Sequence, residues 1–277
     1  MTAIDQYHAL ADAWLAQQDR RRGTAGGDRW GGETARRFRR DPRRTGLEAG
    51  VQAVAGYLAP GDVLLDVGGG AGRMSLPLAL RCREVVNVDP SPGMGREFEA
   101  SAAEAGITNV RFVLGAWTEA PEVQGDVALA AHVTYFVRDI EAFVRKLQRS
   151  ARKRVVLYVR SVPPPNSNPA LYALLNGEPQ ALVPGHRELL PVLWDLGILP
   201  DVVVVPGYSQ TTAQPIGARE RVVAQAARAP GDDPTEAARR RTLIEAHFDE
   251  LFAAVDGGYA PRDSAGAQDL LITWPTA

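Results

Sequence analysis

The stretch Val63-Leu64-Leu65-Asp66-Val67-Gly68-Gly69-Gly70-Ala71-Gly72 decides the fold. Its first five residues form the short, largely apolar run that is typical of a buried strand, and the next five are almost all glycine. Residues 73–82 then have the composition of a helix. Glycines let the backbone turn sharply and approach a ligand without a Cβ clash, and the helix start behind them offers free N–H groups. The stretch therefore predicts a strand, a ligand-binding turn and a helix.

The same alternation continues along the chain. Further strands are predicted at 84–89, 110–113, 126–130, 154–159, 202–205 and 270–274. Helices are predicted at 2–19, at 92–105 before Gly106, and after a cap at Asp139. Another helix should begin at Asp233 and Pro234 and continue through Val255. Strands separated by helices imply a mainly parallel sheet with right-handed crossovers.

A second acid follows the glycine turn at a meaningful distance. Asp89 stands 17 residues after Gly72, at the end of the next predicted strand, where a carboxylate can accept both ribose hydroxyls of an adenosine cofactor. Dinucleotide folds favour G-x-G-x-x-G/A, but the third position is Arg73 counted from Gly68 and Ser75 counted from Gly70. The spacing is instead G-x-G-x-G, preceded by Asp66.

This pattern resembles the D/E-x-G-x-G-x-G turn of the class I S-adenosylmethionine-dependent methyltransferases. Three further segments resemble the later motifs of that family in the same order: 86–91, 109–117 and 130–136. The resemblance covers residues 60–160. It implies a Rossmann-like, doubly wound, mainly parallel sheet, completed by a sixth strand and an antiparallel seventh, and it implies S-adenosylmethionine as cofactor.

The resemblance also assigns candidate site residues. Those expected to bind the cofactor are Asp66, Gly68, Gly70, Gly72, Asp89, Pro90, Met94, Ala116, Trp117 and Ala131. The catalytic candidates are His132 and Tyr135, which follow the fourth strand and should face the methyl group and the acceptor. One position departs from the family: Ala116 stands where an acid often binds the adenine amino group, so backbone groups or Trp117 would have to hold adenine.

Structural roles compete with these assignments. Asp66 is either a brace for the glycine turn or a cofactor ligand, and Met94 and Trp117 are either adenine contacts or core residues. His132 is a general base, a substrate hydrogen-bonder or a structural histidine, and Tyr135 fits a pocket wall better than a proton carrier. Asp89 is better explained by ribose binding than by a helix cap.

Composition excludes several classes of protein. The 277 residues carry a net charge of −2, 45% apolar and 23% charged residues, which fits an α/β domain with additions and not a polycation. The single cysteine, Cys82, and four scattered histidines offer no metal site, so no metal is expected. The chain has no apolar run of 18 residues and starts without a secretion signal, so we expect a cytoplasmic protein.

Arginines gather before the first strand. Ten of them lie between Arg20 and Arg44 against three acids, a local net charge of +7, so the rest of the chain carries −9. We expect residues 1–50 to form a helical cap or lid over the domain of residues 51–277, with Trp30 and Phe38 packed inward and arginines paired to acids of the domain. A helical insertion is expected at about 207–268, before the last strand.

These observations lead to methyl transfer from S-adenosylmethionine to an oxygen, nitrogen or carbon of a small organic acceptor. The alternative is an RNA methyltransferase that uses the arginine-rich segment. A further alternative is a cofactor-binding protein without transfer activity, or an NAD-dependent enzyme. The sequence assigns neither the acceptor nor an oligomeric state.

Overall fold

The computed structural model describes residues 1–22, 28, 30–206, 217–228 and 233–276. Parts of the arginine-rich segment (23–27 and 29) and of the expected insertion (207–216 and 229–232) lie outside the described residues. Within the described chain, no helix is both long and apolar enough to cross a membrane.

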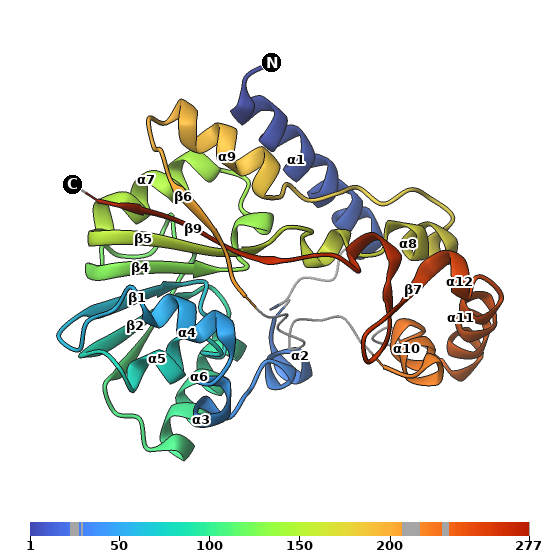
Figure 1. The fold of residues 1–277 in the computed structure, drawn as a ribbon, viewed down its shortest axis with the longest axis horizontal. Helices are drawn as coiled ribbons and strands as arrows, with labels where there is room; N and C mark the ends of the chain where they lie inside the picture. Colours follow the sequence, from blue (N-terminus) through green and yellow to red (C-terminus); the bar gives the residue numbers. More distant parts are fainter. Residues whose placement is uncertain (23–27, 29, 207–216, 229–232, 277) are drawn as a thin grey trace.

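A seven-stranded sheet organises the molecule (Figure 1). In spatial order its strands are β3 (Val110–Leu114), β2 (Glu84–Asp89), β1 (Val63–Val67), β4 (Gly125–Ala131), β5 (Ala151–Arg160), β9 (Asp269–Pro275) and β6 (Asp201–Val204). Pairing is parallel from β3 to β5, and β9 is antiparallel to both of its neighbours. The mainly parallel, doubly wound sheet with an antiparallel seventh strand is therefore confirmed.

Helices cover both faces of the sheet. One face packs against α1 (Ala3–Arg22), α7 (Ile140–Ser150) and α9 (His186–Asp195), and the other against α4 (Ala49–Ala55), α5 (Ser75–Ala79) and α6 (Pro92–Ala105). The predicted N-terminal helix is present, and it buries Tyr7, Ala11 and Trp14. Two short helices, α2 (Gly32–Arg37) and α3 (Pro42–Thr45), connect α1 to α4.

Local sequence fixes the ends of α6. Ser91 accepts a hydrogen bond from the Met94 N–H at 3.1 Å, Pro92 follows at the first helical position, and Gly106 ends the helix with φ of 66°. The start of α6 therefore lies directly behind Asp89, the last residue of β2.

A smaller cluster lies beyond the carboxyl ends of the strands (Figure 1). It contains α8 (Pro169–Asn176), α10 (Arg219–Ala226), α11 (Pro234–Ala246), α12 (Phe248–Leu251) and the hairpin β7 (Phe252–Val255) and β8 (Gly258–Pro261). Three short 3₁₀ segments complete the chain at Thr134–Phe136, Pro164–Asn166 and Arg262–Ser264.

The hairpin corrects one expectation. A helix begins at Asp233, as predicted, but it ends at Ala246, and Phe252–Val255 form a strand and not a continued helix. The apolar spacing has a different cause: the Phe248 ring stacks on Phe252 at 4.9 Å across the change from helix to strand. The described part of the segment expected as an insertion therefore contains helices and a terminal hairpin.

Candidate functional site

The glycine turn connects β1 to α5 and is hydrogen-bonded to the neighbouring strand β2. Gly68, Gly70 and Gly72 have φ of 69°, 53° and 82°, and the Gly68 N–H donates to the Val88 carbonyl at 2.7 Å. An added Cβ would lie 2.6 Å from protein side chains at Gly68 and Gly72, but 3.5 Å from the nearest atom, the Met94 sulfur, at Gly70. Gly70 is thus the residue of the three where an added Cβ would meet its nearest neighbour, Met94, at ordinary van der Waals distance rather than in a clash.

Asp89 is hydrogen-bonded to this turn. Its Oδ2 accepts the Gly70 N–H at 3.0 Å, its Oδ1 accepts the Ser91 N–H at 2.9 Å, and the Asn87 amide donates to the Gly70 carbonyl at 3.0 Å. Burial raises the pKa of Asp89, and the nearby charge of Asp28 adds to that effect. Each carboxylate oxygen keeps capacity for a second hydrogen bond, so Asp89 can accept two hydroxyls.

Asp66 is buried beneath the turn. Neither of its carboxylate oxygens has a hydrogen-bond partner among the described residues, and the Ser75 hydroxyl nearby lies outside hydrogen-bonding geometry. Burial raises the pKa of Asp66 to about 7, against a smaller opposing effect of Ser75. A buried carboxyl group without a partner is rare in proteins and indicates strain or a place for a ligand.

The predicted catalytic pair lies at the carboxyl end of β4. His132 has φ of 60°, an uncommon conformation for a residue with a side chain, and the next residue, Val133, packs on Gly68. The Tyr135 hydroxyl lies 3.3 Å from His132 Nδ1 and accepts the Arg160 N–H at 2.6 Å. Burial, with the charges of Arg73 and Arg160, lowers the pKa of His132 to about 3, and burial raises the pKa of Tyr135.

A buried ion pair lies next to His132 and Tyr135. Arg160, at the end of β5, lies with its Nε 3.7 Å from Asp269 Oδ1, and Asp269 Oδ2 accepts the Tyr158 hydroxyl at 2.6 Å. The Tyr158 ring meets the His132 ring at a centroid distance of 5.0 Å. Arg160 and Asp269 were not among the site residues predicted from the sequence. Each is a charged residue at one end of an apolar strand, and that pattern could have indicated them.

The segment before the first strand lies on the glycine turn. Asp28 accepts hydrogen bonds from the Ser91 hydroxyl at 2.8 Å and the Gly93 N–H at 2.9 Å, both at the start of α6. Trp30 packs with a small apolar cluster that consists of Ala35, Ala71 and Met94. Trp30 therefore packs inward as expected, whereas Phe38 does not: it remains 42% exposed and meets Trp30 edge-on.

Arginines of this segment contact acids of the domain. Arg36 lies 3.7 Å from Glu97, and Arg39 lies 3.5 Å from Glu97 and also pairs with Glu104. These contacts join α2 and the residues after it to α6. They are the kind of pairing that the charge imbalance predicted.

The remaining predicted residues lie in different surroundings. Pro90 is exposed beside Asp89, while Ala116 and Ala131 are half-buried after β3 and at the end of β4. Trp117 is buried in the core, where its indole N–H donates to the Phe143 carbonyl at 3.2 Å and the Lys146 ammonium lies 4.9 Å from the ring centre. These contacts correspond to the core alternative for Trp117 and give the ring no open face for adenine.

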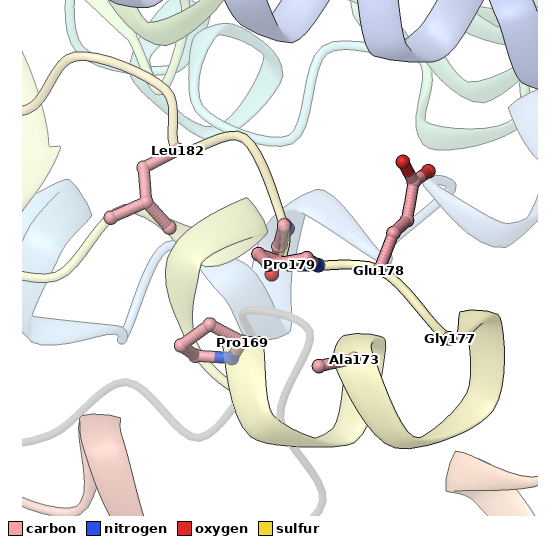
Figure 2. Close-up of a pocket in the computed structure, with 7 residues that line it drawn as sticks. Pro169, Ala173, Gly177, Glu178, Pro179 and Leu182 are labelled. Atoms are coloured by element: carbon pink, nitrogen blue, oxygen red, sulfur yellow. The ribbon is translucent and has the colours of Figure 1, made fainter.

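Two shallow cavities are found elsewhere. One, of about 400 Å³, is formed by α8 and the loop after it, with Pro169, Ala173 and Leu182 among its walls (Figure 2). The other, of about 300 Å³, adjoins α8 and includes Arg21, Tyr172 and Arg240. Neither includes a predicted site residue. Among the described residues, no group of histidine, cysteine or acidic side chains is arranged to hold a metal ion.

Comparison with known proteins identifies the central part of the chain. Residues 65–159 match the family model described as a methyltransferase domain. The chain is 39% identical over 112 residues to ubiquinone biosynthesis O-methyltransferase of Methylobacterium nodulans, a match that covers 40% of each protein. The chain thus matches less than half the length of this curated relative.

Solved structures agree with the fold. A putative methyltransferase from Bacillus halodurans superposes with a TM-score of 0.57 at 13% identity, covering 82% of this chain and 97% of the other. A methyltransferase from Thiobacillus denitrificans, solved with S-adenosylhomocysteine, superposes with a TM-score of 0.51 at 14% identity, covering 82% and 90%. The chain therefore has a Rossmann-like fold shared with solved methyltransferases, and its residues 65–159 match a methyltransferase-domain model, in agreement with the resemblance seen in the sequence.

Proposed function

We propose that this protein transfers a methyl group from S-adenosylmethionine to a small organic acceptor. The observation that carries the proposal is Asp89, fixed by the Gly70 and Ser91 N–H groups at the edge of the sheet with two acceptor positions to spare. Two neighbouring hydroxyls on a ribose match this arrangement.

Other residues of the turn fit the same cofactor. Gly70 is the least crowded of the three glycines, with only the flexible Met94 side chain within 4 Å of an added Cβ, so a ligand would approach the backbone there. The two unpartnered oxygens of Asp66 would be satisfied by N–H donors, such as the ammonium of the methionine portion. Met94 and Ala116 stand beside the turn and after β3, where they would contact adenine, and Pro90 and Ala131 would line the entrance and the floor.

When bound, S-adenosylmethionine supplies an electrophilic methyl group on a sulfonium. The protein has to position the acceptor and exclude water. His132 and Tyr135 lie beside the glycine turn and are our candidates for contact with the acceptor. The O-methyltransferase relative from Methylobacterium nodulans supports an oxygen atom as the first acceptor to test.

The N-terminal segment is proposed to act as a lid, with its described residues 30–39 held on α6 by Trp30, Arg36 and Arg39. These arginines have acidic partners within the chain, so no observation requires a phosphate partner, and we do not favour the RNA alternative. The proposed location is the cytoplasm.

Mass spectrometry of ligand that remains bound through purification, followed by calorimetry, tests the cofactor. We expect S-adenosylmethionine or its demethylated product to be found, and S-adenosylhomocysteine to bind. Binding of NAD with no binding of either sulfur compound would contradict the proposal. Transfer is tested with isotopically labelled methyl donor and a panel of phenols, amines and carboxylic acids. Wild-type protein that binds the cofactor yet methylates none of these would favour a binding protein.

A further inference from the structure

The hydroxyl of Tyr135 determines how His132 carries its proton. A tyrosine hydroxyl has one hydrogen to donate and two lone pairs to accept. The Arg160 N–H occupies one lone pair at 2.6 Å, and because a backbone N–H can only donate, the direction of this bond is fixed. Among the described residues, His132 Nδ1, at 3.3 Å, is the other hydrogen-bonding partner of this hydroxyl.

The two neutral forms of His132 differ in how many buried groups they leave unpaired. With the hydrogen on Nδ1, His132 would donate to Tyr135, and both the Tyr135 hydrogen and the Nε2 lone pair would lack a partner. With the hydrogen on Nε2, Tyr135 donates to Nδ1, and only the Nε2 hydrogen lacks one. Since each unpaired buried group is costly, the second form is favoured.

The surroundings also disfavour the imidazolium. The charged groups that act on His132 are Arg73 and Arg160, both positive, and the neighbouring hydroxyl groups of Tyr135 and Tyr158 have pKa values raised by burial. Burial and the two arginines lower the pKa of His132 to about 3. The ring is therefore neutral at pH 7.

We propose that His132 is a fixed Nε2–H donor that orients an oxygen of the acceptor, and that it is not the base that removes the acceptor's proton. The inference rests on the proposed methyl transfer. His132 Nε2 is buried without a partner, on a residue held at φ of 60° whose neighbour Val133 packs against Gly68. A donor kept unpaired on a strained backbone beside the glycine turn is prepared for a ligand.

The chemical class of the acceptor follows from the charges. An N–H donor flanked by Arg73 and Arg160 favours an oxygen that carries negative charge, such as a phenolate. A phenol that has lost its proton to solvent needs no base on the protein: its oxygen forms the new bond to the methyl carbon while the carbon–sulfur bond breaks, and the electron pair stays on sulfur. His132 holds the oxygen in line and takes up no proton.

The proton position is measured directly by NMR of the full chain labelled with ¹⁵N-histidine. The spectrum of His132→Gln identifies the His132 signals among the four histidines. At pH 7 we expect the neutral Nε2–H form, and in Tyr135→Phe, which lacks the donor to Nδ1, a mixture of both neutral forms. A protonated ring, or a predominant Nδ1–H form in the wild type, would overturn the proposal. This measurement needs no substrate, so it decides the proton position even if the proposed function fails.

The role of the donor is tested by comparing His132→Gln with His132→Leu, using catechol as acceptor probe. Glutamine supplies an N–H but no base, whereas leucine of similar size supplies neither. We expect His132→Leu to lower kcat/KM by about 10–100-fold, the effect of losing a hydrogen bond to a charged oxygen, and His132→Gln to recover most of that loss. Exposed His247, changed to Gln, is the matched control and should leave the rate unchanged.

Two results would contradict the role. Equal loss of rate in both variants would show that a base is needed. A parallel loss of S-adenosylhomocysteine affinity would show that the donor serves the cofactor and not the acceptor. Folding of each variant is checked by its melting temperature, because both replace a buried residue.

Discussion

Asp66 and His132 should affect stability with pH in opposite directions, and this can be measured. Burial raises the pKa of Asp66 from its ordinary value of 3.8 to about 7. In the unfolded chain the carboxyl group is ionised above pH 4, whereas in the folded protein it stays protonated up to about pH 7. The folded state therefore binds the extra proton in this window, and the free energy of unfolding falls as pH rises.

The size of the effect follows from the two values. One pKa unit corresponds to about 1.4 kcal/mol, so the change from 3.8 to about 7 corresponds to about 4 kcal/mol. Asp66→Asn removes the ionisation and nearly keeps the shape. We expect the difference in unfolding free energy between this variant and the wild type to shift by about 4 kcal/mol from pH 4 to pH 8, in favour of the variant at high pH.

His132 produces the reverse slope. Its pKa is lowered from 6.5 to about 3, so the unfolded chain binds the extra proton between these values and stability rises with pH, by about 5 kcal/mol over the window. The two effects nearly cancel between pH 4 and pH 6.5. Relative to the wild-type profile, the free energy of unfolding of Asp66→Asn should thus rise with pH there and that of His132→Gln should fall.

Urea unfolding at half-unit steps from pH 4.5 to pH 8.5 is the assay. Acids whose pKa is lowered in the folded protein, such as Asp12 and Asp126, change stability only at lower pH and do not interfere. If the difference in unfolding free energy between Asp66→Asn and wild type stays constant across this pH range, Asp66 is ionised like an ordinary aspartate. That result would refute the argument for an unsatisfied carboxyl group.

Three further predictions concern cofactor binding and the lid. Asp89→Ala should weaken S-adenosylhomocysteine binding about 10–100-fold by calorimetry, through loss of about 1–3 kcal/mol in hydrogen bonds to a charged group, and an unchanged Kd would remove Asp89 from the site. Gly70→Val should abolish binding and lower Tm through backbone strain at φ of 53°, whereas Gly72→Val, with similar strain and a Cβ 2.6 Å from neighbouring side chains, should lower Tm further; equal behaviour would contradict the assignment. Arg39→Glu should weaken binding by less than about fivefold, as expected for a partly exposed ion pair, and adding Glu97→Arg should restore part of it; no recovery would argue against docking through this pair.

The sequence was sufficient for the central sheet because the signals there are local. The apolar run of β1, the glycine turn and the acid at the end of β2 each lie within one strand–turn–helix unit, and their spacing fixes the register of the turn against Asp89. The chain direction of the last strand was inferred from the resemblance to the family, since the residues predicted for it, 270–274, carry no signal of orientation.

The buried ion pair of Arg160 and Asp269 next to His132 could not be predicted in the same way. Arg160 and Asp269 are 109 positions apart, and they meet because β5 and β9 pair antiparallel with Arg160 opposite Asp269. Only knowledge of that register places the two charges together. The hairpin of β7 and β8 was missed for a related reason: aromatic residues spaced for a helix also suit a stack between a short helix and a strand.

For Trp117, the sequence predicted the position at the carboxyl edge of the sheet but not the direction of its side chain. Spacing correctly located residues 116 and 117 after β3, at the carboxyl edge where a cofactor would lie. The chain then folds back, with the Ala120 N–H donating to the Ala116 carbonyl at 2.7 Å, and the Trp117 ring turns under the edge toward α7. Once the indole N–H has bonded the Phe143 carbonyl, a swing toward the cofactor would give up this buried hydrogen bond and open a cavity the size of an indole. For the cofactor proposed above, we therefore expect adenine to be recognised by the residues that remain at the edge, chiefly Ala116 through its backbone and Met94 through its side chain.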